Sequence, residues 1–134
     1  MATVSIEYLG DLRTKCTHLK SGNTVITDAP TDNNGRGENF SPTDLVATAY
    51  ISCMMTIVGI YCDKNNIPFH TATGSVLKTM AGGPRRVAGL TIQLDFSGNN
   101  WNLEIQQNVI AAAEACPVAK SVHGDIELTF EYTF

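Results

Sequence analysis

The sequence predicts an α+β fold in which antiparallel strands pack on two helices. The first observation is a long apolar segment, residues 42–65, that begins with clear helix signals. The second is a set of strand-like segments on both sides of it, and the third is another helical segment at residues 103–115. Runs of neighbouring strands interrupted by single helices are typical of α+β domains with antiparallel sheets.

Three short segments at the start of the chain alternate as strands do. Residues 3–9 are predicted as a strand, and residues 12–19 as a second one after a Gly10-Asp11 turn. Residues 23–27 form a short third strand, and residues 28–39 form a long loop rich in Asp, Asn, Gly and Pro.

The first helix is predicted to run from Pro42 to about Asn65. Ser41 is a favourable N-cap residue, Pro42 fits the first helical position, and Asp44 completes a variant of the capping box. The helix is apolar nearly all round, which predicts that it is buried. A chain of 134 residues is too small to cover such a helix alone, so we expect a dimer.

The rest of the chain is predicted to add strands and one more helix to a single domain, residues 1–134. Pro68 prevents continuation of the first helix, and residues 71–80 and 87–96 form a strand pair. Asn102 caps the second helix, residues 103–115, and residues 126–134 close the chain as a strand.

Composition narrows the class of protein. A net charge of −4 with no basic stripe argues against nucleic-acid or acidic-membrane partners. Residues 1–10 do not resemble a signal peptide, and the apolar stretch at residues 45–61 is interrupted by Thr, Ser and Gly, which argues against a membrane span. We therefore expect a cytoplasmic protein, in which cysteines stay reduced unless they are catalytic or bind metal.

The four cysteines show no metal-binding spacing, and the three histidines are scattered. A single cysteine is most often a small buried hydrophobic residue, and we expect this of Cys16 and Cys62. Cys53 lies in the middle of the buried helix, where a thiol is inert unless a cation reaches it. Arg13 and Arg36 are the candidate cations, although each also fits an ordinary solvated surface charge.

Cys116 precedes Pro117, which disfavours helical backbone at the cysteine. If Pro117 begins a helical turn, Cys116 is its N-cap, and the free N–H groups there favour the thiolate. The alternative is a chance Cys-Pro pair at a helix end.

Two motifs are similar to those of the osmotically inducible protein C and organic hydroperoxide resistance (OsmC/Ohr) family. Ser41-Pro42-Thr43-Asp44-Leu45 followed by Ser52-Cys53 resembles the family's "NPEEL…AAC" helix, and Cys116-Pro117-Val118 with the residues around it resembles its "CPVS" signature. The resemblance covers essentially the whole chain and is nearest to the OsmC-like branch. It implies a bacterial antioxidant protein of the oxidative stress response, with the OsmC-like fold as an intertwined homodimer.

The resemblance also implies that Cys53 is the peroxidatic cysteine and Cys116 the resolving one, with no cofactor. The cysteine becomes a sulfenic acid, the second thiol converts it to a disulfide, and a dithiol or a lipoyl protein reduces that disulfide. The family places a glutamate ten residues before the first cysteine, where this chain has Thr43. Glu38 in the preceding loop is the expected replacement, partnered with Arg36 or Arg13, and Asp44 is the other carboxylate nearby.

Three functions from different classes fit these residues. The first is reduction of organic, and in some cases inorganic, hydroperoxides, with Met54, Met55 and Ile57 as an apolar wall. The second is non-catalytic small-molecule binding or redox sensing in the same dimer cleft, which Thr43 favours. The third is a thiol-dependent hydrolase or transferase, for which His123 is the nearest histidine.

Overall fold

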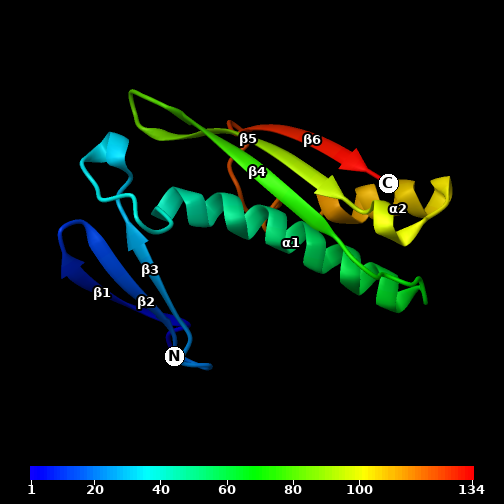
Figure 1. Ribbon diagram of the computed structural model, residues 1–134, viewed down its shortest axis with the longest axis horizontal. Coiled ribbons are helices and arrows are strands. Elements are labelled where there is room, and N and C mark those ends of the chain that lie inside the picture. Colours follow the sequence, from blue (N-terminus) through cyan, green and yellow to red (C-terminus); the bar gives the residue numbers. More distant parts are fainter. The chain divides into compact units, whose positions relative to one another are not determined.

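The computed structural model describes all residues, Met1–Phe134, and confirms the α+β class. The residues cluster into two compact units, Met1–Val46 and Ala47–Phe134, whose boundary falls inside the first helix. Figure 1 shows the elements of both units coloured along the chain. The prediction of a single domain, residues 1–134, stays a prediction.

The first unit contains an antiparallel sheet with the strand order β1-β2-β3. Its strands are β1 (Val4–Gly10), β2 (Arg13–His18) and β3 (Thr24–Asp28), all three within two residues of the predicted bounds. One face of this sheet is apolar but uncovered within the chain. Its exposed apolar side chains include Val4, Ile6, Tyr8 and Val25. A sheet of this size is unstable without a partner for its apolar face.

Helix α1 (Pro42–Lys64) starts as the capping signals predicted. The Ser41 hydroxyl accepts a hydrogen bond from the Asp44 amide at 3.0 Å, and the Asp44 carboxylate accepts one from the Ser41 amide at 2.9 Å. These reciprocal bonds form a capping box with Asp in the place of Glu.

The second unit contains the sheet β4-β5-β6, which corrects the expectation of wholly antiparallel pairing. Strands β4 (Thr73–Ala81) and β5 (Arg86–Asp95) form the predicted antiparallel pair. Strand β6 (Glu127–Thr133) instead pairs with β5 in parallel. The physical reason is helix α2 (Leu103–Glu114), which supplies the crossover that two parallel neighbours need.

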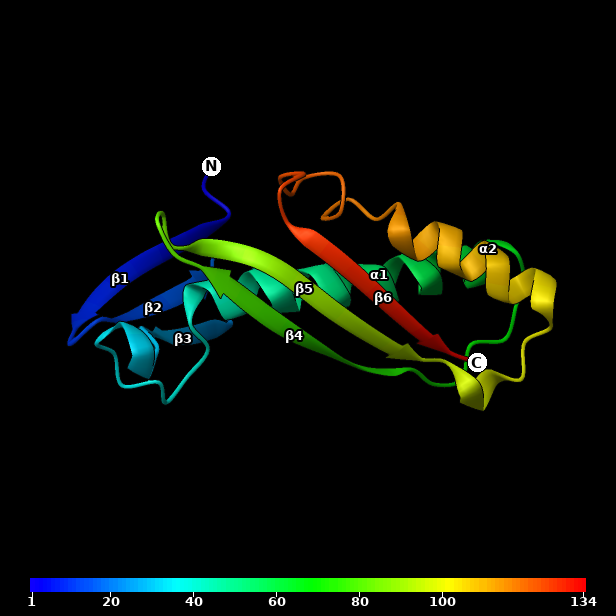
Figure 2. The same cartoon turned by 90° about the horizontal axis from the view of Figure 1, so that it is seen from above.

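Both helices lie on one face of the β4-β5-β6 sheet, so the second unit has two layers (Figures 1 and 2). The core contains one stripe of α1, the inner side chains of β5, and Val109 and Ala113 of α2. The fully buried stripe of α1 is Ala47, Tyr50, Met54, Val58 and Cys62. The helix is therefore not buried all round within one chain, since Ile60 on another face is 44% exposed.

Close packing between α1 and β4 depends on Gly74. A β-carbon at Gly74 would lie 2.9 Å from both the Ile51 and the Met55 side chains of α1, and 2.7 Å from a carbonyl of β5. A larger residue would push the helix away from the sheet.

One buried polar side chain joins two connecting segments of the second unit. The Asn99 side chain accepts hydrogen bonds from the amides of His70 and Thr71 and donates to the carbonyls of Thr71 and Phe96. Nearby, the Trp101 indole donates to the Pro68 carbonyl at 2.9 Å. These bonds fix the segment that follows α1 against the end of β5.

By length and composition alone, α1 is apolar enough to cross a membrane, with a mean hydropathy of 1.8 over its most apolar window. This differs from the expectation that the segment is too polar to span. The core helix of a soluble protein passes the same test, and one stripe of α1 is packed in the core of the second unit.

Candidate thiol site

The second unit brings Cys53 and Cys116 together, as the resemblance implied. Cys53 comes from the middle of α1 and is half-buried, whereas Cys116 follows the end of α2 and is fully buried. Cys53 packs against the core cluster that contains Cys116, it raises the pKa of the Cys116 thiol, and both thiols are free. Two neighbouring thiols can form a disulfide once their α-carbons come within about 4.4–6.8 Å of each other.

The backbone after α2 holds Cys116 as an N-cap, as its position before Pro117 predicted. The Ala119 amide donates to the Cys116 sulfur at 3.4 Å, and the Lys120 amide donates to the Cys116 carbonyl at 3.1 Å. The N–H groups there favour the thiolate, as expected, but burial has the larger and opposite effect. Burial raises the pKa of the Cys116 thiol, the Ala119 N–H opposes that rise, and the neighbouring Cys53 adds to it.

Two tyrosines interact with the buried thiol, and a glutamate interacts with both tyrosines. Tyr50 of α1 has its pKa raised by burial, then by Cys116 and Glu114. Tyr132 of β6 has its pKa raised by burial, then by Glu114, Tyr50 and Cys116. The sequence analysis missed Tyr50, Tyr132 and Glu114, because they come from three elements and only Glu114 lies near a motif cysteine in the sequence.

Arg13 is the centre of an ion-pair network in the first unit. Its Nε and Nη2 donate to the two oxygens of Asp28 at 2.7 and 3.0 Å, and Nη2 also donates to Glu38 at 3.2 Å. Asp28 is fully buried, and the side-chain amide of Asn39 donates a hydrogen bond to its carboxylate at 3.0 Å. These contacts fix the plane and direction of the guanidinium.

The pKa values of this network follow from its contacts. The Arg13 hydrogen bond, more than any other contact, holds the pKa of Asp28 far below its ordinary range. The Asp28 hydrogen bond, more than any other contact, raises the pKa of Arg13.

Asp28 is a residue that sequence reasoning missed. It is the direct cross-strand partner of Arg13 between β2 and β3. An Arg and an Asp on neighbouring predicted strands carry a usable signal, since opposite charges often face each other across a strand pair. To predict that Arg13 and Asp28 are paired, the register of β2 against β3 must be known. The sequence of two strands joined by a loop of unknown conformation does not determine that register.

Arg36 is held by a different carboxylate from the one expected. Its guanidinium pairs with Asp11 at 2.7 Å, and both side chains are well exposed, at 39% and 78%. The expectation that Glu38 could hold Arg36 is therefore wrong, because Glu38 pairs with Arg13. Asp44 serves as the capping residue of α1, whereas Glu38 pairs with Arg13.

The other expected sites are placed as follows. His123 lies on an exposed turn, where its Nδ1 accepts a hydrogen bond from the Asp125 amide at 3.2 Å. Cys62 is buried and its pKa is raised, mainly by burial, which fits the structural role expected of it. No group of three or more His, Cys, Asp and Glu side chains is arranged to hold a metal ion.

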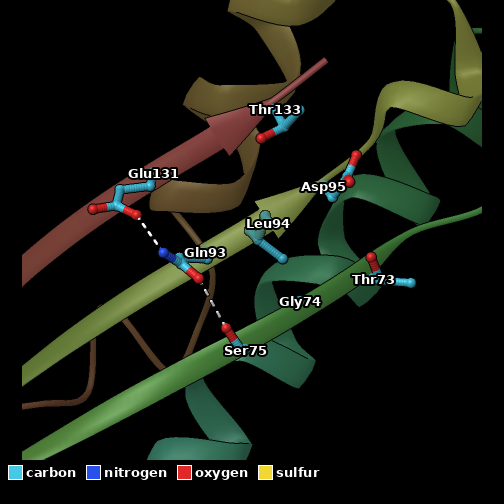
Figure 3. Close-up of a pocket in the computed structure, with 8 residues that line it drawn as sticks. All are labelled: Thr73, Gly74, Ser75, Gln93, Leu94, Asp95, Glu131 and Thr133. Atoms are coloured by element: carbon cyan, nitrogen blue, oxygen red, sulfur yellow. Dashed lines mark hydrogen bonds between the residues drawn. The ribbon is translucent and has the colours of Figure 1, made fainter.

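A polar groove of about 430 Å³ lies on the face of the sheet opposite the helices, away from the cysteines. Figure 3 shows Ser75, Gln93 and Glu131 in a row across its three strands. Gln93 accepts from Ser75 at 3.1 Å and donates to Glu131 at 2.6 Å. The three side chains are hydrogen-bonded to one another, an arrangement that is ordinary for polar residues on a solvent-exposed face of a sheet.

Comparison with known proteins decides the family. A family model described as "OsmC-like protein" matches residues 35–131, which include both motif cysteines. The chain belongs to the OsmC-like family. A Psychrobacter arcticus protein, provisionally assigned to osmotic stress induction and the detoxification response, is 45% identical to this OsmC-like chain. That similarity covers 98% of this chain and 96% of the other, with a TM-score of 0.93.

More distant OsmC-like structures share the fold. The Legionella pneumophila OsmC, an organic hydroperoxide resistance protein, is 14% identical over 100% of this chain and 98% of its own, with a TM-score of 0.78. An organic hydroperoxide resistance protein from Elizabethkingia anophelis is 15% identical over 99% and 96%, with a TM-score of 0.77. No curated protein matches the sequence.

Proposed function

We propose that this OsmC-like protein reduces organic hydroperoxides through Cys53, with Cys116 as the resolving thiol. The observation that supports this most directly is that Cys53 packs against the core cluster that contains Cys116 and raises the pKa of its thiol. A second support is that two proteins with the same fold are organic hydroperoxide resistance proteins.

The chemistry needs two thiols and no cofactor. The Cys53 thiolate attacks the terminal oxygen of the hydroperoxide, the O–O bond breaks, and the alkoxide takes a proton and leaves as an alcohol. Cys53 is then a sulfenic acid, which the Cys116 thiol attacks to form a disulfide and water. Two equivalents of external thiol, from a dithiol or a lipoyl protein, return both cysteines to the reduced state.

Arg13 is the proposed activator of Cys53. A cation close to a thiol favours the thiolate, and Arg13 is the arginine that carboxylates hold in a fixed orientation. Asp28 and Glu38 are the proposed positioning residues for this arginine. Glu38 supplies the carboxylate that the family expects and Thr43 lacks.

A homodimer in the cytoplasm is part of the same proposal. The exposed apolar face of the β1-β2-β3 sheet and the exposed face of α1 belong to the same chain. A second copy of the chain presents the same two apolar surfaces. If the two copies bury these surfaces against each other, neither the sheet face nor the α1 face is exposed in the dimer.

The experiment that tests the function is chemical trapping. The reduced protein is treated with one equivalent of cumene hydroperoxide in the presence of dimedone, and the modified residue is located by mass spectrometry. Cys116→Ser is expected to carry dimedone on Cys53, whereas wild type forms the Cys53–Cys116 disulfide. A protein that shows neither product is not a peroxidase of this kind.

Redox sensing is the second candidate, and Thr43 is the observation that favours it. With a threonine in place of the family glutamate, the loop carboxylate beside Arg13 is Glu38, which is 66% exposed. A sensor forms the disulfide once and keeps it. It therefore gives the same trapping result as a peroxidase, but it does not reduce further peroxide when a dithiol is supplied.

A further inference from the structure

The two sulfurs of a Cys53–Cys116 disulfide differ in how easily an external thiol can reach them. Cys116 is 0% exposed and belongs to the buried core cluster of the second unit, whereas Cys53 is half-buried. In thiol–disulfide exchange the attacking thiolate approaches one sulfur in line with the S–S bond, so the rate depends on access to that sulfur. Attack on Cys116 would need a path through the core, whereas the proposed function already requires Cys53 to be open to a hydroperoxide.

The backbone turn after α2 places a fixed donor on the buried sulfur. The Ala119 N–H donates a hydrogen bond to the Cys116 Sγ at 3.4 Å. Two further bonds hold the turn that carries this N–H. The Lys120 amide donates to the Cys116 carbonyl at 3.1 Å, and the Ser121 hydroxyl donates to the Pro117 carbonyl at 2.8 Å. A donor fixed in this way can stabilise negative charge as it develops on the sulfur.

This donor matters most when Cys116 carries negative charge. Burial raises the pKa of the Cys116 thiol, which makes its thiolate a poor leaving group, and the Ala119 N–H opposes that rise. Without the N–H, a thiolate expelled into the core would have lost its contact with water and gained no partner. The step that depends on this contact is therefore the one in which the S–S bond breaks and Cys116 leaves.

We propose that the reductant attacks the Cys53 sulfur of the disulfide and that the Ala119 N–H stabilises Cys116 as the leaving thiolate. One thiolate of a dithiol bonds to the Cys53 sulfur, the S–S bond breaks, and its electron pair goes to Cys116. The second thiolate of the dithiol then attacks the reductant's own sulfur and expels Cys53, and the dithiol leaves as a cyclic disulfide. Cys116 takes up one of the two protons that the dithiol released to solvent.

This inference rests on the proposed pairing of Cys53 with Cys116, but its test needs no peroxide. Protein with Cys16→Ser, which removes the other half-buried thiol, is oxidised with diamide and mixed with excess glutathione. A monothiol cannot cyclise, so the first mixed disulfide accumulates. Aliquots are quenched with N-ethylmaleimide and mapped by mass spectrometry. The expected first product carries glutathione on Cys53 and N-ethylmaleimide on Cys116.

The role of Ala119 is tested in the same assay with Ala119→Pro, which removes the N–H that contacts the sulfur. Formation of the mixed disulfide should slow by about tenfold or more, the usual effect of losing a hydrogen bond to a charged group. Release of glutathione from Cys53 by a second thiol does not expel Cys116, so this second step should keep its wild-type rate. Ala119→Gly keeps the N–H and should react as wild type does.

Ser121→Ala is the matched control for a loosened turn. It removes the hydrogen bond to the Pro117 carbonyl but retains the Ala119 N–H, so the first step is expected to stay within about twofold of wild type. Equal slowing of both steps in Ala119→Pro would indicate a merely structural effect and would overturn the role of Ala119. An unchanged first step in Ala119→Pro would do the same.

The position of the first mixed disulfide tests the direction of attack without any variant of the turn. Glutathione found first on Cys116 would overturn the proposed direction. If diamide forms no Cys53–Cys116 disulfide, the pairing itself fails and this inference fails with it. If the disulfide forms and opens at Cys53 but the protein consumes no hydroperoxide, the inference holds and only the peroxidase proposal is wrong.

Discussion

Arg13 and Asp28 face each other across β2 and β3, and the guanidinium donates to both carboxylate oxygens of a fully buried aspartate. A bidentate pair of this kind fixes the orientation of an arginine better than a single contact does. Glu38 adds a third hydrogen bond from a more exposed position. The arginine network therefore has a rigid part, Asp28, and a part open to solvent, Glu38.

Arg13→Ala is expected to slow alkylation of Cys53 by iodoacetamide at pH 7 by about tenfold or more, the usual effect of losing a nearby opposite charge. Arg36→Ala is the matched control, because Arg36 pairs with Asp11 and not with the carboxylates around Arg13. Site-specific alkylation is measured by mass spectrometry. Equal rates in Arg13→Ala and wild type would remove Arg13 from the mechanism.

Stability at acid pH should depend on Asp28. Its pKa is depressed in the folded protein, so its contribution to the free energy of unfolding is complete above about pH 4, the ordinary value for an aspartate. The contribution is lost as the pH falls further towards the folded-state pKa. Asp28→Asn should lower the melting temperature at pH 7 and flatten its dependence on pH below about 4. Thermal unfolding of both proteins between pH 2.5 and 7 checks this, and parallel curves would contradict it.

The Asn99 network is expected to contribute measurably to stability. Asn99→Ala removes the hydrogen-bond partner of backbone groups of His70, Thr71 and Phe96, of which Phe96 is fully buried. The expected loss is about 1–3 kcal/mol in the free energy of unfolding, the usual cost of an unsatisfied buried group. Urea denaturation measures it, with Asn102→Asp as a control that keeps an acceptor at the N-cap of α2. An unchanged midpoint in Asn99→Ala would show that the network is dispensable.

The exposed apolar face of the first sheet should be covered by a second copy of the chain. Ile6 and Tyr8 are 59% and 64% exposed in a single chain, so Ile6→Glu should weaken association by placing a charge in the interface. Sedimentation velocity is expected to show a dimer for wild type at micromolar concentration and a shift towards monomer for the variant. Glu7→Gln, on the other face of β1, is the control. A compact wild-type monomer would contradict the proposal.

Much of this fold could be predicted from local signals. The capping box at Ser41 and Asp44 and the turn residues between strands depend on few neighbouring residues, which is why their positions were predicted closely. The parallel pairing of β6 with β5 was not predicted, because strand direction depends on the crossover through α2 and not on either strand's pattern.

The candidate site also contains residues that the sequence predicted and residues that it did not. Cys53 and Cys116 belong to motifs and were identified from sequence, whereas Asp28 and Tyr132 lie far in the sequence from Arg13 and Cys116, with which they interact. The raised pKa of Cys116 also escaped prediction. A local signal, the N-cap position before Pro117, favoured the thiolate, but burial by the surrounding core has the larger effect.

The most direct test of the central claim is steady-state loss of cumene hydroperoxide with dihydrolipoate as the reductant. Wild type should consume many equivalents, Cys53→Ser none, and Cys116→Ser about one before over-oxidation, because only the resolving thiol protects the sulfenic acid. Cys62→Ser is the control and should retain turnover, since Cys62 is buried on another face of α1. Normal turnover in Cys53→Ser, or no turnover in wild type, would contradict a Cys53-dependent peroxidase.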